Sequence, residues 1–559
     1  MKRISLLFPV VLCFFFCFCS AQPSQTGFRF THTDSLRGSI NPQRDWWDVL
    51  KYDISIKPDY ISKFVTGVNT ITFSVVSDRQ DQTMQIDLQE PMVIDSVIYQ
   101  HKKTDFKKID TNAWYVYFKN LPRPKPHSEK PNVSISIYYH GNPRIAKRPP
   151  WDGGWIFAKD KLGRPWMTVT CQGFGASVWY PCKDHLSDEP DNGASLSITV
   201  PDTLVAVGNG RLKQKKDNGD GTATYIWAVV NPINNYNIIP YIGKYATWHE
   251  DYQGEKGKLD CDFWVLDYNL DKAKTEFLVV DSMLKCFEYW FGPYPFYEDG
   301  YKLVESPHLG MEHQSAVAYG NKFQKGYLGK DLSETGWGLK WDFIIVHESG
   351  HEWFGNNITC KDIADEWIHE GLTNYSETIF TQYYFGKEAG NDYNYGIRKK
   401  IENKWPIIGY YGVNDEPRGT DLYYKASNMI QTIRQVINND SLFRSILRGL
   451  NKTFYHQTVT TAQVEHYIST HSKIDFSKVF DQYLRTIQIP VLEYKQDGYT
   501  LSYRWSNCVK GFAMPLKVDF KGSRWIVPAE KWQKLSLYPE GDSTFTINRN
   551  FYNNLKKVD

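Results

Sequence analysis

The sequence predicts a multidomain α+β protein with a β-rich N-terminal domain, a mostly helical central domain and a small β-rich C-terminal domain. At 559 residues the chain is too long for a single hydrophobic core. Apolar and polar residues alternate between residues 49 and 245, and helix-spaced apolar residues dominate between 344 and 446. Short alternating runs return after Ile487. The predicted domains are residues 22–245, 246–486 and 487–559.

The first 21 residues have the composition of a secretory signal peptide. A Lys-Arg pair supplies the positive charge, residues 6–18 the apolar segment, and the small residues up to Ala21 the cleavage site. This run is short for a membrane-spanning helix, and no later stretch is long and apolar enough to be one. We expect cleavage after Ala21 and export to the periplasm or the extracellular space. Lipid attachment at Cys19 is the alternative, although a poor lipobox precedes it.

The N-terminal domain is predicted to be an antiparallel β-sandwich or a large antiparallel sheet. Runs with period two, such as Tyr52–Ile56, Thr70–Val75 and Val133–Ile137, are separated by clusters of Gly, Pro, Asn and Asp. Asp217–Thr222 is a strong hairpin-turn signal between two strands. Residues 22–45 lack such a pattern, and we expect an irregular lead-in there.

The central domain is predicted to start with a helix over residues 272–290, where apolar residues recur at helical spacing. Gly292 and Pro293 then stop this helix. Further helices are expected between residues 344 and 446, including one over 429–437. The strand-like runs after Ile487 form the small C-terminal β-domain.

Composition excludes some classes of partner. The net charge is +2 and no long run of like charges occurs, so the sequence does not indicate binding to nucleic acid or another polyanion. The six cysteines after the predicted signal peptide specify no disulfide framework, and buried free thiols explain them equally well.

The motif His347-Glu348-Ser349-Gly350-His351 carries the clearest chemistry. Residues four apart on a helix lie on one face, so the two imidazoles aim at one point, as they do in zinc sites. A catalytic zinc ion takes a third protein ligand and keeps one position open. Glu370, on the next predicted helix, is the natural third ligand. Glu348 follows the first histidine, where a carboxylate can act as general base on the attacking water. A chance match of these spacings is the alternative.

The flanks of this motif resemble the zinc signature of the aminopeptidase N family, which also includes leukotriene hydrolase. The resemblance lies in His351–Asn356 and Trp367–Gly371 and extends over nearly the whole predicted mature chain. It implies a thermolysin-like, mostly helical catalytic domain that holds one Zn²⁺ ion. It also implies a short form of the family, without the large C-terminal helical domain that many members have.

Two further segments resemble the family's substrate-binding parts. Leu309-Gly310-Met311-Glu312-His313 is similar to the G-x-M-E-N strand, which implies that Gly310 and Met311 contact the peptide and that Glu312 pairs with its α-ammonium group. Thr170–Gly173 is similar to a Gln-containing loop, which implies that Gln172 helps to bind the same group. Leu309 and His313 depart from the family pattern. A structural acid at Glu312 and a buried Gln172 that bonds to the backbone are the alternatives.

Tyr423-Tyr424-Lys425-Ala426 resembles the family's Y-x-K-G segment. The resemblance implies that Tyr423 donates a hydrogen bond to the oxyanion, with Tyr424 as the competing choice. Ala426 replaces the usual glycine.

Other carboxylates and one histidine near the motif have expected supporting roles. Family members place a carboxylate at the position of Glu377, which implies that it orients a metal-bound histidine, and Asp365 is a weaker candidate. Glu352 is expected to be structural or solvated. His369 is expected to lie behind the ligands or on the surface.

The sequence therefore predicts a secreted zinc aminopeptidase that removes N-terminal residues from peptides with a free N-terminus. In this mechanism metal-activated water attacks the first peptide carbonyl. A zinc endopeptidase and a non-catalytic binding protein on the same scaffold are the alternatives. The preferred N-terminal residue, the peptide length and the oligomeric state have no counterpart in the sequence pattern.

Overall fold

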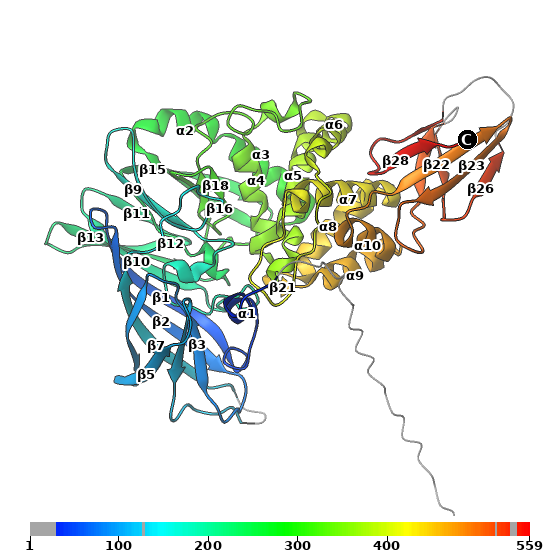
Figure 1. The fold of residues 1–559 in the computed structure, drawn as a ribbon. Coiled ribbons are helices and arrows are strands. Elements are labelled where there is room, and N and C mark those ends of the chain that lie inside the picture. Colours follow the sequence, from blue (N-terminus) through cyan, green and yellow to red (C-terminus); the bar gives the residue numbers. More distant parts are fainter. Residues whose placement is uncertain (1–28, 126–128, 520–522, 537–544) are drawn as a thin grey trace, which may run out of the picture.

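The computed structural model describes residues 29–125, 129–519, 523–536 and 545–559 (Figure 1). The predicted signal peptide, including Cys19, lies outside these ranges. Two hydrophobic cores organise the described residues, one inside the N-terminal β-domain and one shared by the helical region and the C-terminal strands. The predicted fold class is confirmed, with a β-rich N-terminal domain, a helical region and C-terminal strands in succession along the chain.

A ten-stranded sheet forms the larger layer of the N-terminal domain. Its strands are β1 (Trp47–Asp59), β2 (Phe64–Val75), β3 (Thr83–Asp87), β4 (Val93–Tyr99), β5 (Lys102–Lys108), β6 (Ala113–Tyr117), β7 (Asn132–Gly141), β10 (Ala194–Pro201), β12 (Arg211–Asp217) and β13 (Thr222–Val229). They lie in the order β12-β13-β10-β1-β2-β7-β4-β5-β6-β3 and are antiparallel except for the parallel pair β1 and β10. In β7, Val133, Ile135 and Ile137 are buried while the residues between them are more exposed, which is the predicted period of two.

A four-stranded sheet forms the second layer, in the order β11-β14-β9-β8. Its strands are β8 (Gly154–Lys159), β9 (Pro165–Thr170), β11 (Val205–Val207) and β14 (Tyr241–Gly243). Strand β9 ends at Thr170, so the loop that follows carries Gln172 out of this sheet.

The prediction of an irregular lead-in is wrong for its described part, because helix α1 spans His32–Gly38. A capping box starts this helix, since the side chain of Thr31 accepts from the backbone of Asp34 and that of Asp34 accepts in return. Helix α1 joins two distant loops. Arg37 Nη2 donates to the carbonyl of Gly173 at 2.7 Å, and the backbone N–H of Asn414 donates to the carbonyl of Asp34 at 3.0 Å.

A five-stranded sheet opens the central region, in the order β15-β16-β17-β19-β18. Its strands are β15 (Tyr245–Gly254), β16 (Gly257–Leu266), β17 (Tyr301–Glu305), β18 (Gly310–Met311) and β19 (Val317–Tyr319). The single helix predicted over residues 272–290 is instead two helices, α2 (Leu270–Glu276) and α3 (Val279–Phe291). Gly292 ends α3 with a φ of 101°, a conformation that favours glycine.

The remaining helices of the central region are α4 (Phe343–Gly350), α5 (Trp367–Phe385), α6 (Lys387–Ile397), α7 (Asp421–Ile437), α8 (Asp440–Thr453), α9 (Thr461–Ser472) and α10 (Ser477–Arg485). Helix α5 packs against α4, α6 and α7. Its approach to α7 is close, because a Cβ on Gly371 would lie 2.5 Å from the Cβ of Ala426. In the ranges given above, no helix is both long enough and apolar enough to cross a membrane.

The short elements of the N-terminal and central domains are mostly single turns. They are the 3₁₀ turns η1 (Ala176–Val178), η2 (Asn235–Asn237), η3 (Asp267–Asn269), η4 (Trp337–Lys340), η6 (Ile363–Asp365) and η7 (Arg398–Lys400), the π-turn η5 (Glu352–Asn356), and the paired strands β20 (Ile358–Cys360) and β21 (Gln457–Val459).

The C-terminal strands form two small sheets, β26-β23-β22-β28 and β25-β24-β27. They are β22 (Val491–Asp497), β23 (Thr500–Ser506), β24 (Leu516–Asp519), β25 (Ser523–Ile526), β26 (Gln533–Ser536), β27 (Thr546–Ile547) and β28 (Asn554–Lys557). Buried residues here, such as Leu492 and Trp505, belong to the same core as the central helices. The six cysteines in the described ranges are all free, and all except Cys508 are buried.

Candidate active site

A cavity of about 690 Å³ is lined by residues from the N-terminal domain, strand β18 and helices α4, α5 and α7. Every predicted site residue lines it, although these residues come from widely separated parts of the sequence. They are Gln172, Gly310, Met311, Glu312, His347, Glu348, His351, Glu370 and Tyr423.

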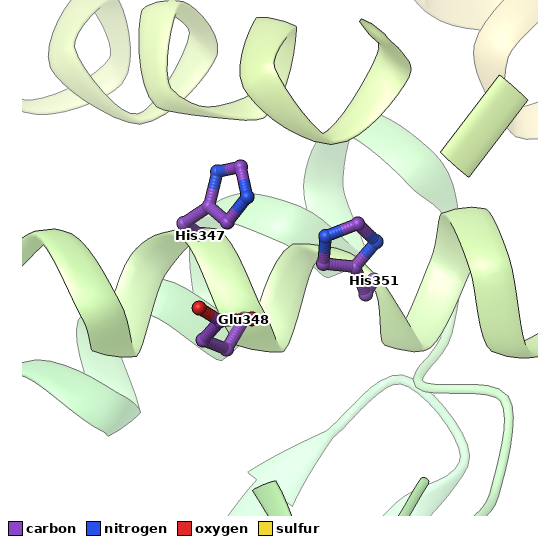
Figure 2. A group of neighbouring side chains, drawn as sticks. All are labelled: His347, Glu348 and His351. Atoms are coloured by element: carbon purple, nitrogen blue, oxygen red, sulfur yellow. The ribbon is translucent and has the colours of Figure 1, made fainter. Parts of the chain in front are cut away.

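The two histidines are presented by helix α4. Asp342 caps this helix, because its side chain accepts a hydrogen bond from the backbone N–H of Ile345 at 3.2 Å. His347 lies in α4 and His351 directly after it, and both imidazoles project from the same side of the helix (Figure 2). Glu348 projects from a neighbouring side, which is the placement that the motif predicts.

Helix α5 brings Glu370 to the same point. Its Oε2 atom lies 3.6 Å from Nε2 of His347 and 3.3 Å from Nε2 of His351. The other ring nitrogen of each histidine is engaged elsewhere. Nδ1–H of His347 donates to Oε1 of Glu377 at 2.7 Å, and Nδ1–H of His351 donates to the carbonyl of Phe354 at 3.0 Å. These bonds leave both Nε2 lone pairs directed at Glu370.

The donor set fits a zinc ion. Oε2 of Glu370 is buried and has no hydrogen-bond partner among the described residues. A buried oxygen of this kind is costly unless a ligand satisfies it. Two imidazole nitrogens and one carboxylate are the ligands of many catalytic zinc sites, in which a fourth position stays open. His347, His351 and Glu370 are therefore the residues that could hold the metal.

Glu348 is held close to strand β18. A Cβ on Gly310 would lie 2.6 Å from Oε1 of Glu348 and 2.7 Å from Cγ2 of Ile344, so the absence of a side chain at Gly310 makes room for this carboxylate. Burial raises the pKa of Glu348 to about 7, although the two neighbouring imidazoles oppose the shift. A carboxyl with such a pKa can both accept and return a proton near neutral pH.

Glu312 is buried directly after β18. Its Oε1 accepts a hydrogen bond from the hydroxyl of Tyr236 at 2.9 Å, and its backbone carbonyl accepts one from Nδ2 of Asn356 at 2.9 Å. Burial raises the pKa of Glu312, with His351 opposing the shift. Its carboxylate is therefore fixed in place and has no cationic Lys or Arg partner within ion-pair distance among the described side chains.

Gln172 lines the cavity with a free amide group. Its Nε2 atom is buried and has no hydrogen-bond partner in the described part of the chain. The alternative was a buried glutamine whose amide bonds to the backbone. In the structure the Nε2 atom of Gln172 makes no such bond.

Tyr423 lies in the first turn of α7, and its ring centroid is 6.2 Å from that of His347. Burial and then the charge of Glu370 keep the pKa of Tyr423 well above its usual value, so its hydroxyl stays protonated and can donate. Tyr424 lines the same cavity, with its ring centroid 6.2 Å from that of Tyr423. Both tyrosines remain within reach of the site.

The carboxylates that were expected to support the site differ in what they contact. Glu377 bonds to His347, whereas Asp365 accepts hydrogen bonds from the hydroxyls of Thr461 and Tyr411, each at 2.6 Å. The prediction that Asp365 could orient a metal-bound histidine is therefore wrong. Glu352 is buried and accepts from the backbone of Ser315 at 2.9 Å, so it is structural.

His369 is buried behind the ligands, because its Nε2 accepts the backbone N–H of Cys360 at 2.7 Å. Among the three departures from the family pattern, only Leu309 lines the cavity. His313 is buried against the hydroxyl of Tyr241, and Ala426 packs against α5.

Three acidic residues of the cavity, Glu366, Glu402 and Glu416, were not predicted from the sequence. Glu366 precedes Glu370 by one helical turn, so the i, i+4 spacing used for the histidines would have placed it on the same face. Glu416 lies in an irregular segment before α7, where no local pattern indicates which way a side chain points.

Comparisons with known proteins indicate a protein family for the helical region. Residues 277–483 match the description "Peptidase family M1 domain". The similar curated proteins include leukotriene A-4 hydrolase of Xenopus laevis, 22% identical over 63% of this chain and 59% of the relative. They also include leucine aminopeptidase 2 of Vanderwaltozyma polyspora, 23% identical over 80% and 65%, and human aminopeptidase B, 25% identical over 48% and 37%. The alignments span between about a third and two thirds of these relatives.

Solved structures show the same fold. An M1 zinc metallopeptidase from Deinococcus radiodurans superposes with a TM-score of 0.62 and 19% identity, over 77% of this chain and 91% of that one. A mutant of that enzyme, bound to a Tyr-Ser-Ala substrate, superposes with a TM-score of 0.64 and 19% identity, over 79% and 95%. The resemblance noted in the sequence is confirmed, because the helical region is a peptidase family M1 domain and the fold is that of M1 metallopeptidases.

Proposed function

We propose that this chain, with its peptidase family M1 domain, is a zinc-dependent aminopeptidase that releases N-terminal residues from peptides. The observation that carries the proposal is the meeting, in one cavity, of a zinc-ligand set with an unsatisfied oxygen on Glu370 and a fixed buried acid, Glu312. The first feature supports hydrolysis and the second supports selection of a free amino terminus.

His347, His351 and Glu370 would hold one zinc ion. When bound, zinc polarises a carbonyl oxygen and makes water a better nucleophile at neutral pH. Glu348 takes a proton from the attacking water and returns it to the leaving amine. Tyr423 donates its hydroxyl to the oxygen of the attacked carbonyl, where negative charge develops.

Glu312 and Gln172 are the proposed anchors of the substrate. The carboxylate of Glu312 pairs with the α-ammonium group, and the unpartnered amide of Gln172 supplies a further polar contact. Binding an acylated or internal segment would leave the buried carboxylate unpaired, which costs roughly 1–3 kcal/mol or more. Gly310 and Met311, in β18 directly before Glu312, would contact the peptide backbone.

We further propose that the chain is exported, on the composition of residues 1–21. N-terminal sequencing of protein recovered outside the cytoplasm tests this proposal. A first residue at position 22 is expected, and recovery of the intact N-terminus would contradict it.

The function is tested with purified, zinc-loaded protein and a series of aminoacyl-anilides. We expect hydrolysis of unblocked substrates, loss of activity with a chelator and recovery on addition of Zn²⁺. His347→Ala should abolish zinc binding, whereas His466→Ala, at an exposed position of α9, should not. Equal cleavage of one peptide with and without an N-terminal acetyl group would favour an endopeptidase. Bound zinc without hydrolysis of any aminoacyl substrate would favour a binding protein.

A further inference from the structure

The charged lining of the cavity is mostly acidic. Its glutamates are Glu312, Glu348, Glu366, Glu370, Glu402 and Glu416, while Lys400 is the single lysine or arginine among the lining residues that the structure describes. In the proposed function, bound cations offset part of this negative charge. A zinc ion balances Glu348 and Glu370, and the α-ammonium group balances Glu312. Glu402, more than a third exposed, pairs with Lys404 at 3.3 Å. Glu366 and Glu416 have no cationic side chain within ion-pair distance in the part of the chain that the structure describes.

Glu366 is a buried carboxylate without a partner. Its exposed fraction is 6%, and its side chain makes no hydrogen bond or ion pair with any residue in the described ranges. It stands at the N-cap position of α5 but makes no capping bond, so the usual structural role of an acid at a helix start is not realised. Burial raises the pKa of Glu366 well above its usual value, and the carboxylates of Glu416, Glu370 and Glu312 add to the rise. A buried carboxylate among like charges is costly unless a cation joins it.

Glu416 lines the same cavity and lies against the loop that follows β9. A Cβ on Gly173 would lie 1.6 Å from its Oε1, so the carboxylate rests on the glycine backbone. The nearby Arg37 is engaged, since Nη2 donates to the carbonyl of Gly173 at 2.7 Å and Nε lies 3.7 Å from Asp184. Within the described residues, no lysine, arginine or histidine nitrogen lies within 4.0 Å of the Glu416 carboxylate.

The location of the two carboxylates indicates which part of a substrate they would meet. Glu366 lies one helical turn before Glu370, and Glu416 lies against Gly173, next to Gln172, so both line the cavity beside the position proposed for the amino terminus. The α-ammonium group and the first side chain branch from the same Cα atom, one bond from that carbonyl. Later residues follow on the far side of the attacked carbonyl. The first side chain is therefore the part of a peptide that can reach these carboxylates.

We infer that Glu366 and Glu416 form a subsite for a second positive charge, the ammonium or guanidinium group of an N-terminal lysine or arginine. This inference rests on the proposed aminopeptidase function, because it takes Glu312 and Gln172 as the anchors of the α-ammonium group. Bound in this way, the side-chain cation supplies the partner that both carboxylates lack. A second metal ion is not favoured, because in the described ranges no group of three ligand atoms within 4.8 Å of one another includes Glu366 or Glu416.

The test compares arginine and citrulline in otherwise identical aminoacyl-anilides, since citrulline has nearly the same shape without the charge. We expect the zinc enzyme to prefer arginine in kcat/KM by about tenfold or more. Glu366→Gln and Glu416→Gln should each reduce that ratio by about tenfold. Glu402→Gln is the matched control at the cavity rim and should leave the ratio within about twofold.

Several outcomes would overturn the subsite while leaving the proposed function intact. One is a ratio near one in the unaltered enzyme, which needs no variant and so does not depend on variant folding. Another is an equal loss on both substrates in Glu366→Gln, which would assign this residue to the α-ammonium group. A second zinc ion per chain that is lost in Glu366→Gln would make the pair a metal site. Failure to hydrolyse any unblocked substrate, citrulline included, would instead overturn the aminopeptidase function itself.

Discussion

The Nδ1 atom of His347 lies 2.7 Å from Oε1 of Glu377, a residue that does not line the cavity. Oε2 of the same carboxylate accepts the hydroxyl of Tyr393 at 2.6 Å, so Glu377 is held on both sides. The carboxylate fixes the orientation and the tautomer of the imidazole and increases its basicity at Nε2. The strength of metal binding thus depends on a residue behind the site.

Glu377→Gln should weaken zinc binding by about tenfold or more, because the charge behind the imidazole is lost while the shape is kept. Competition with a chelator of known zinc affinity measures the change. Glu388→Gln, on the exposed side of α6, is the control and should bind zinc as the unaltered protein does. An unchanged affinity in Glu377→Gln would contradict the assigned role.

Glu312→Gln should reduce kcat/KM on unblocked aminoacyl substrates by about thirtyfold or more, because a buried charge pair loses one partner. Zinc content should stay the same, since Glu312 is not among the proposed ligands. Measuring metal content and melting temperature beside the kinetics separates this effect from damage to the fold. Hydrolysis at the original rate would remove Glu312 from the amine-binding role.

Tyr423→Phe should lower kcat by about a hundredfold or more with little change in KM, because the lost donor acts on charge that appears only during the reaction. The matched variant is Tyr424→Phe, at the neighbouring position in the same cavity. We expect it to change kcat by less than about tenfold. The reverse ranking of the two variants would transfer the role to Tyr424.

Gly310→Ala should lower activity by about tenfold or more, because the added Cβ would lie 2.6 Å from Oε1 of Glu348 and displace it. None of the three atoms nearest to this carbon belongs to a proposed zinc ligand, so metal content should be retained. Gly409→Ala is a milder control, since the nearest atom there is 3.3 Å away and belongs to Ala364. Full activity of Gly310→Ala would show that Glu348 is not held in place by this close approach.

The preference for arginine over citrulline should increase with pH between about pH 6 and pH 8. Burial raises the pKa of Glu416 to about 7, against the opposing charge of Arg37, and the facing carboxylates of Glu370, Asp415 and Glu312 add to the rise. A carboxyl is charged above its pKa, so Glu416 attracts a cation more strongly at the higher pH. Taking the ratio of two substrates cancels any pH effect that both share, such as ionisation of Glu348. A ratio that does not change with pH, or that changes equally in Glu416→Gln, would contradict this expectation.

The parts of the site that follow from local geometry were predictable from the sequence. His347 and His351 are four residues apart on α4, so their convergence is a property of one helix. The strands β1, β2 and β7 follow the alternation of their apolar residues, because each buries one face of the large sheet. Gln172 and Glu312 were located only through the resemblance to a family, since it is tertiary packing that brings these distant segments of the sequence to one cavity.

The features that were missed lack a periodic signal. Helix α1 has seven residues, too few for an apolar stripe, and its capping box uses Asp34 rather than the more usual Glu or Gln. The break between α2 and α3 occurs at Phe277 and Leu278, inside a run whose apolar spacing remains helical. Glu416 points into the cavity because its irregular segment packs on Gly173 and α1, and these contacts are distant in sequence.

The loop that carries Gln172 and Gly173 is part of the N-terminal domain and its core. The metal ligands lie on helices that belong to the second core. The match to the M1 domain begins at residue 277 and therefore contains the ligands without that loop. A fragment limited to that match would contain the metal ligands and Glu312 but would lack Gln172, so it would hold only part of the proposed anchor for the amino terminus. The same holds during biosynthesis, since a chain with undocked cores has no complete pocket for a peptide end. Docking of the two cores thus completes the proposed binding site for the amino terminus.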